Sequence, residues 1–197
     1  MSRHTRSGFT LVEAMIVLAI IGVLAGLAAP ALLATLPNLR VNGASRQILA
    51  DLRMARTQAV EKGKSVVVKF HVDSSGGSSS GTYVLALDNN ADNDFTPSTS
   101  PNDTVISEVT LGRDYSAIEF ASNVSGTPSN GVDLDNATTG DVADTITFRP
   151  NGSASESGDI YLRPSGDNGT RNRRVRVLAA TGNVRIETWN GTTSAWE

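Results

Sequence analysis

An apolar run near the N-terminus constrains the fold of this chain more than any other feature. Residues Ala14–Leu36 carry no charge, and only Gly22, Gly26, Pro30 and Thr35 interrupt the apolar sequence. As a helix with a rise of about 1.5 Å per residue, the run is roughly 35 Å long. That length is enough to cross the hydrocarbon core of a bilayer. The run is therefore predicted to be a membrane-spanning helix.

Two ordinary kinds of segment explain this run only in part. A cleaved secretory signal has an apolar core ahead of a small-residue cleavage site, whereas Met1–Gly8 is basic and has no apolar core. A plain membrane anchor explains the length and the positive flank, but not Glu13 at the edge of the run. A lone carboxylate near lipid costs about 2.5 kcal/mol or more unless it is paired or lies at the interface. A plain anchor with Glu13 at the interface remains the alternative.

The six residues at positions 8–13 read Gly-Phe-Thr-Leu-Val-Glu and join the basic segment to the apolar run. This arrangement resembles the leader and mature start of type IV pilin-like proteins. The resemblance implies that a prepilin peptidase removes residues 1–8 by cutting between Gly8 and Phe9, and methylates the new amino group of Phe9. It also implies that Glu13 pairs with the N-terminal amine of a neighbouring subunit during assembly. Such pairing makes a charge inside an apolar helix bundle tolerable.

The charge balance and the cysteine content narrow the classes of function. Removing Arg3 and Arg6 with the leader leaves 15 basic and 20 acidic residues, a net charge of −5. This excess of acid argues against nucleic-acid binding over the whole surface, although a local basic face is compatible with it. The chain has no cysteine, which excludes disulfides, thiolate metal sites and cysteine nucleophiles.

The basic leader also predicts the orientation of the chain in the membrane. The leader is expected to stay cytoplasmic, because positively charged flanks favour that side. The chain would then cross a bacterial inner membrane once, with the residues after Leu36 on the periplasmic side.

The helix is expected to continue beyond the transmembrane part, residues 9–36, as an amphipathic helix over residues 37–63. Apolar residues recur there at helical spacing and mark one buried face. The residues of that face are Ile48, Leu52, Ala55 and Ala59. Gly63 is a stop signal, because glycine is common just past the end of a helix.

From residue 64 the apolar pattern changes to a period of two, which indicates short strands between polar loops. The longest loop is expected at residues 122–144. The predicted fold class is α+β, with the long N-terminal helix packed on an antiparallel β-sheet head domain over residues 64–197. The expected strands are residues 66–72, 83–87, 104–111, 115–121, 145–149, 159–163, 174–178, 184–189 and 192–196.

The C-terminal third carries a second resemblance. The segments Ile146–Gly152, Ile160–Arg163, Arg173–Val177 and Thr181–Arg185 resemble the H-type minor pseudopilin of type II secretion. The T-type minor pilin of type IV pili shares this domain. The resemblance implies a structural subunit at or near the tip of a filament that drives protein secretion. Its implied partners are the other pilin-like subunits, the prepilin peptidase and the inner membrane. The alternative is a type IV minor pilin that binds DNA for uptake in natural transformation.

A group of arginines carries that alternative. Arg174 and Arg176 share one face of an expected strand, and Arg171 and Arg173 come just before it. One interpretation is a solvated strand face that protects a sheet edge. The other is contact of all four arginines with DNA phosphates. T-type minor pilins bind DNA through a Gly-Arg-x-Arg motif, whereas Gly169–Arg173 reads Gly-Thr-Arg-Asn-Arg, with one residue inserted after the glycine.

Signals for enzyme chemistry are absent, so no catalytic residue is expected. The sequence contains no Gly-x-Ser-x-Gly elbow, no His-Glu-x-x-His motif and no phosphate-binding glycine loop. His71, the one histidine after the leader, is expected on the outer surface of a strand rather than in the role of a base.

One polar run has the pattern of a metal site. It places oxygen side chains at alternate positions, as calcium loops do. It lacks a glycine at the sharp turn, so the simpler interpretation is a solvated turn and calcium binding is the alternative. The candidate ligands are Asp88, Asn90, Asp92 and Asp94, and no other cofactor is expected.

Overall fold

The computed structural model describes residues 9–72, 78–93, 95, 103–121, 124, 127, 131–134, 144–167 and 171–197. It divides into two compact units, Met1–Pro37 and Asn38–Glu197. The long helix α1 (Leu11–Lys62) begins in the first unit and ends in the second. The predicted leader, with the cleavage residue Gly8, and the candidate calcium ligand Asp94 lie outside the described residues.

In the first unit, α1 contains a segment that is long and apolar enough to cross a membrane. This segment is Leu11–Ala28, with a mean hydropathy of 2.6, and none of it is buried inside the protein. Leu11, Leu18 and Leu27 are each more than two-thirds exposed. A row of exposed apolar side chains needs an apolar environment from outside the chain, which either lipid or neighbouring helices supply.

In the second unit, α1 buries one face in the head domain. The fully buried apolar side chains on this part of the helix recur every three or four residues, which is the helical period. They are Val41, Ala44, Ile48, Leu52, Ala55 and Ala59, and they include the four that the sequence predicts. The helix ends at Lys62, and Gly63 follows with φ +62°, a left-handed conformation that favours glycine.

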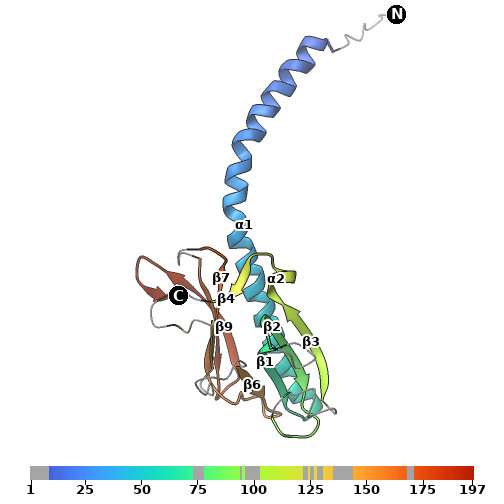
Figure 1. Ribbon diagram of the computed structural model, residues 1–197, viewed down its shortest axis with the longest axis vertical. Coiled ribbons are helices and arrows are strands. Elements are labelled where there is room, and N and C mark those ends of the chain that lie inside the picture. Colours follow the sequence, from blue (N-terminus) through green and yellow to red (C-terminus); the bar gives the residue numbers. More distant parts are fainter. Residues whose placement is uncertain are drawn as a thin grey trace, which may run out of the picture. The chain divides into compact units, whose positions relative to one another are not determined.

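The first sheet is four-stranded and antiparallel, in the order β3-β2-β1-β6 (Figure 1). Both of its faces are covered, because Phe95 packs on Val67, Val84 and Ala86 on the side opposite the main core. The simple alternation of the sequence places Val67 outward, whereas the structure buries it. The strands are β1 (Val66–Val72), β2 (Ser78–Leu87), β3 (Thr104–Thr110) and β6 (Thr145–Phe148).

The second sheet is also antiparallel and has the order β10-β9-β8-β7-β4, with β5 pairing β7 as well. The sequence predicts strands at these places except at β5, which lies inside the segment 122–144 predicted as a loop. A short helix, α2 (Leu111–Asp114), follows β3. The strands are β4 (Ile118–Phe120), β5 (Val132–Leu134), β7 (Gly158–Pro164), β8 (Arg173–Leu178), β9 (Asn183–Asn190) and β10 (Ala195–Trp196).

One main core joins the buried face of α1 to both sheets. The rings of Phe70, Tyr83 and Phe120 meet at its centre, with centroids 5.6–6.2 Å apart. Tyr83 donates a hydrogen bond of 2.6 Å from its hydroxyl to Asp51 on α1. Burial, and then the nearby Asp51 carboxylate, raises the pKa of Tyr83 far above its ordinary value. The phenol therefore stays protonated and holds the helix to the sheet. The fold class is α+β, as predicted.

His71 differs from its prediction. The register of β1 shifts between Phe70 and Val72, and His71 adopts φ +60° at this irregularity. The residue is 7% exposed, and its ring meets Phe120 edge-on at a centroid distance of 5.5 Å. The prediction of an outer-surface histidine is therefore wrong, because a β-bulge breaks the alternation of strand faces on which it rests.

Candidate functional site: the helix start and the arginine face

The start of α1 is built as a capped helix terminus. Thr10 accepts hydrogen bonds at its carbonyl from Ala14 N (3.2 Å) and at its hydroxyl from Glu13 N (3.3 Å). Thr10 is therefore the N-cap of α1, and Glu13 is the third helical residue. The Glu13 carboxylate lies in the first turn, where the helix dipole favours negative charge. The spacing Thr-x-x-Glu at positions 10–13 is the sequence signal for this cap.

Phe9 lies just before the cap and is 77% exposed. Glu13 is exposed as well. An exposed carboxylate one turn after an exposed N-terminal segment has the placement that pairing between subunits requires. Cleavage at Gly8, methylation of Phe9 and pairing of Glu13 stay predictions.

The loop that begins at Asp88 is held together by its own side chains. Asp88 is buried, and its two carboxylate oxygens accept hydrogen bonds from Ala91 N (2.6 Å) and Asn93 N (3.0 Å). Asn90 donates to Asp92 at 2.6 Å. Within the described residues, no three His, Cys, Asp or Glu side chains come close enough together to hold a metal ion. The calcium site stays a prediction, and what the structure shows of this run is a self-capped turn.

Arg174 is the centre of the arginine face on the second sheet. It stands on β8 between Glu187 of β9 and Tyr161 of β7 in the register of the sheet. Its guanidinium donates to Glu187 Oε2, with Nε at 2.8 Å, and to Asp159 Oδ2 at 3.2 Å. Arg174 is only 8% exposed. Cross-strand neighbours of opposite charge stabilise a sheet, and here they neutralise a buried cation.

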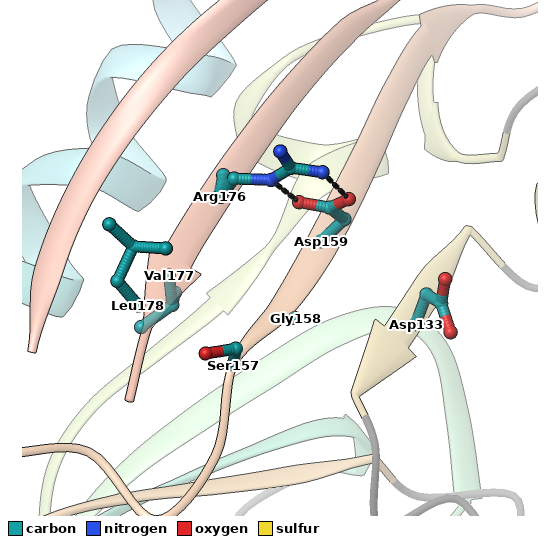
Figure 2. Close-up of a pocket in the computed structure, with 7 residues that line it drawn as sticks. All are labelled: Asp133, Ser157, Gly158, Asp159, Arg176, Val177 and Leu178. Atoms are coloured by element: carbon teal, nitrogen blue, oxygen red, sulfur yellow. Dashed lines mark hydrogen bonds and ion pairs between the residues drawn. The ribbon is translucent and has the colours of Figure 1, made fainter. Parts of the chain in front are cut away.

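Arg176 extends the same network to the edge of an open cavity. It donates two hydrogen bonds of 2.7 Å to the two oxygens of Asp159, and Figure 2 shows both of them. The Asp159 carboxylate raises the pKa of Arg176 above its ordinary value. The cavity beside this pair has a volume of about 240 Å³ and is also lined by Asp133, Ser157 and Leu178. The charge that Arg176 presents to this cavity is already paired.

Aromatic rings of the C-terminal hairpin cover the network. The guanidinium carbon of Arg174 lies 4.7 Å from the ring centroid of Trp196 on β10. Trp196 in turn contacts Tyr161 and Trp189, with centroids 5.6 Å and 5.3 Å apart. Burial, followed by the nearby Asp159 carboxylate, raises the pKa of Tyr161. A guanidinium that lies over an indole ring and is shielded from water makes a favourable cation–π contact. Strand β10 therefore covers the ion pairs of Arg174 with the ring of Trp196.

The other two predicted arginines have different surroundings. Arg171 pairs with Asp167 at 2.9 Å. Arg173 points to the opposite side of β8 from Arg174 and donates to Asn42 Oδ1 on α1 at 2.8 Å. Burial lowers the pKa of Arg173. The structure therefore brings Arg174 and Arg176 together through Asp159, as their shared strand face predicts, and places Arg173 against the helix.

Comparison with known proteins assigns the family. A family model described as type II transport protein GspH matches residues 44–181, and a prokaryotic N-terminal methylation motif matches residues 3–29. The chain belongs to the GspH family. Members of this family are structural pilin-like subunits rather than enzymes, and family membership implies no cofactor.

Individual relatives share only part of this chain or a low sequence identity with it. Pilin-like protein PilA1 of Thermus thermophilus is 36% identical over 94 residues, which are 47% of this chain and 55% of that protein. The match thus spans about half the length of this relative. The minor pseudopilin EpsH from the type 2 secretion system of Vibrio cholerae is 13% identical, with a TM-score of 0.48 over 75% of this chain and 92% of that one. The type IV minor pilin FimU of Pseudomonas aeruginosa is 14% identical, with a TM-score of 0.47 over 75% and 87%.

Proposed function

We propose that this chain is a minor pseudopilin of a type II secretion system, a structural subunit at or near the tip of a pilus-like filament that drives protein secretion. The observation that carries the proposal is the combination of a GspH-type head with an exposed, capped, apolar helix behind a methylation motif. A filament subunit uses each of these parts: the helix for the bundle, its capped start for pairing, and the head for the outer surface.

The maturation pathway follows from the N-terminal motif. The prepilin peptidase cuts between Gly8 and Phe9 and methylates Phe9. Before assembly, the apolar helix crosses the bacterial inner membrane once, with the N-terminus cytoplasmic and the head periplasmic. The positively charged leader supports this orientation.

Assembly then depends on Glu13. In the membrane the carboxylate sits at the interface, near the capped end of α1, where its charge is tolerable. In the filament it accepts the N-terminal amine of a neighbouring Phe9, or of the equivalent residue of another subunit. The positive end of the helix dipole stabilises the charged Glu13 carboxylate but does not attract a cation, so the ion pair itself supplies the specificity.

The contacts of the arginine face favour secretion over DNA uptake. Short charge-assisted hydrogen bonds join Arg174 to Glu187 and Arg176 to Asp159. DNA phosphates would have to displace these carboxylates before they could bind the two arginines. Arg173 is half-buried and directed to α1. DNA contact by these arginines stays a hypothesis that a salt titration can test.

The experiment that separates the two functions is a deletion in the native host, complemented by the full-length gene. We expect the deletion to reduce secretion of type II substrates into the medium and to leave the frequency of natural transformation unchanged. Loss of transformation with normal secretion would contradict the proposal. Complementation with a Gly8→Val variant serves as a matched control, because that chain inserts in the membrane but is not processed.

A further inference from the structure

Ten of the twelve arginines of the head unit fall into two groups. Six arginines outside α1 each form an ion pair with a carboxylate: Arg113, Arg163, Arg171, Arg174, Arg176 and Arg185. The four on α1 are exposed, and none of them has a carboxylate partner within the described residues: Arg40, Arg46, Arg53 and Arg56. The fold therefore neutralises six arginines of the head by ion pairs, while Arg149 and Arg173 donate to a backbone carbonyl and to the amide of Asn42. The four helix arginines keep a charge that no described carboxylate pairs.

Arg46 and Arg53 belong to an exposed stripe on the helix, opposite the buried face. The stripe residues recur every three, four or seven positions: Leu39, Arg46, Ala50, Arg53, Thr57 and Val60. Leu39 and Val60 are 62% and 53% exposed. Arg40 and Arg56 flank the stripe on its two sides. The stripe thus alternates arginine with small or apolar side chains, a composition typical of protein interfaces, in which arginine is enriched.

Two of the arginines are held in place by backbone carbonyls of the head unit. Arg53 donates to Val184 O at 3.3 Å, and Arg56 donates from Nε to Gly152 O at 2.9 Å. A Cβ at Gly182 would lie 2.3 Å from Gly152 O and 3.1 Å from Arg56 Nε, so glycine is required for this close approach. Each guanidinium keeps further N–H donors. A side chain that is already ordered loses less conformational entropy on binding.

The charge of the head is divided in a way that identifies the chemistry of the partner. Residues 38–62 contain five basic and two acidic side chains, whereas residues 63–197 contain ten basic and 17 acidic ones. The helix segment is therefore +3 and the remainder −7. The net negative charge of the head beyond the helix is opposite in sign to that of the helix segment, so the helix segment of one subunit is attracted to the rest of the head of a similar neighbour. Such a contact joins two different patches, and repeating it extends an assembly.

We propose that the exposed stripe of α1 docks against an acidic, partly apolar surface on the head of a neighbouring pilin-like subunit. The inference rests on the proposed function and adds to it a second contact, formed by the head unit, beside the apolar helix bundle. Arg46 and Arg53 lie at the centre of the contact, while Leu39 and Val60 provide its apolar ends. Complementary charge fixes the register between subunits and raises the rate of association.

The test is site-specific photocrosslinking of the full-length chain in its native membrane. A photoreactive residue replaces Ala50, at the centre of the stripe. We expect a crosslink to a pilin-like subunit, on a peptide with more Asp and Glu than Lys and Arg. Replacing Arg46 and Arg53 by glutamine should lower the crosslink yield roughly tenfold, whereas replacing both by lysine, which keeps the charge, should retain it. A crosslinked peptide that is neutral or basic, a crosslink to nucleic acid, or an equal yield from the glutamine variant would overturn the proposal.

A second probe separates this inference from the proposed function. A photoreactive residue at Leu18, in the apolar half of α1, reports entry into the filament bundle independently of the head. Crosslinks from Leu18 without any from Ala50 would refute the docking stripe and leave the filament role intact. The absence of crosslinks from both positions would refute the filament role as well.

Discussion

The ion pairs of Arg174 allow a stability prediction that depends directly on the structure. Replacing Arg174 by methionine removes the bonds to Asp159 and Glu187 but keeps a flexible side chain under Trp196. The two carboxylates are then left in a buried place with fewer partners. Asp159 retains Arg176, and Glu187 retains Arg185 at 2.7 Å.

The size of the effect follows from burial. Removing one partner of a buried ion pair lowers the free energy of unfolding by about 3–5 kcal/mol. Because Asp159 and Glu187 each keep another arginine, we expect a loss of about 3 kcal/mol for this variant. Arg163→Met is the matched control, because Arg163 and Glu119 pair across strands of the same sheet but are partly exposed. An exposed pair contributes less than about 1 kcal/mol. At about 2–4 °C per kcal/mol for a domain of this size, Arg174→Met should melt about 6–12 °C lower.

The assay is thermal unfolding of the full chain in detergent micelles, followed by tryptophan fluorescence. The chain has two tryptophans, Trp189 and Trp196, and both lie in the hairpin that covers Arg174. The emission therefore reports on this part of the head directly. Equal midpoints for wild type and Arg174→Met, or an equally large shift in Arg163→Met, would show that the network does not stabilise the sheet as argued.

Three further predictions concern pH, DNA and assembly. The raised pKa of Tyr83 means that only the unfolded phenol ionises above about pH 10, so the free energy of unfolding should fall with rising pH by up to about 1.4 kcal/mol per pH unit. Tyr83→Phe should flatten that slope in urea titrations between about pH 9 and about pH 11, and an unchanged slope would contradict the assignment. In a salt titration, the full chain should show no DNA binding through the arginine face. A log–log slope of about −3, reduced by about one unit in Arg173→Gln, would instead support DNA uptake. Glu13→Ala should insert normally in the membrane yet crosslink less to other pilin-like subunits, and unchanged crosslinking would mean that the charge is only interfacial.

The helix could be predicted from the sequence because its signals are local. The charge-free run, the spacing of Ile48, Leu52, Ala55 and Ala59, and Gly63 all lie within a few turns of the feature that they specify. Most strands could be predicted for the same reason. The sequence did not predict that the strands form two sheets rather than one, or that β5 lies inside a polar segment. Both features depend on pairing between distant segments, which a local residue pattern does not encode.

The arginine face shows the same limit at the level of a site. The shared strand face of Arg174 and Arg176 was predictable from the alternation of β8. Their partners were not, because Asp159 and Glu187 reach them only through the register of β7, β8 and β9. His71 was misplaced because a one-residue bulge reverses the faces that alternation predicts. In both cases, the missing information is long-range geometry rather than residue chemistry.

The proposed filament role depends most directly on how the chain begins after maturation. The intact mass and the N-terminal sequence of the protein, purified from its native membrane, decide this. We expect a chain that starts at Phe9 and carries one N-methyl group, with residues 1–8 removed. A chain that still starts at Met1, or one that is cut beyond Ala29 as a secretory signal would be, contradicts it.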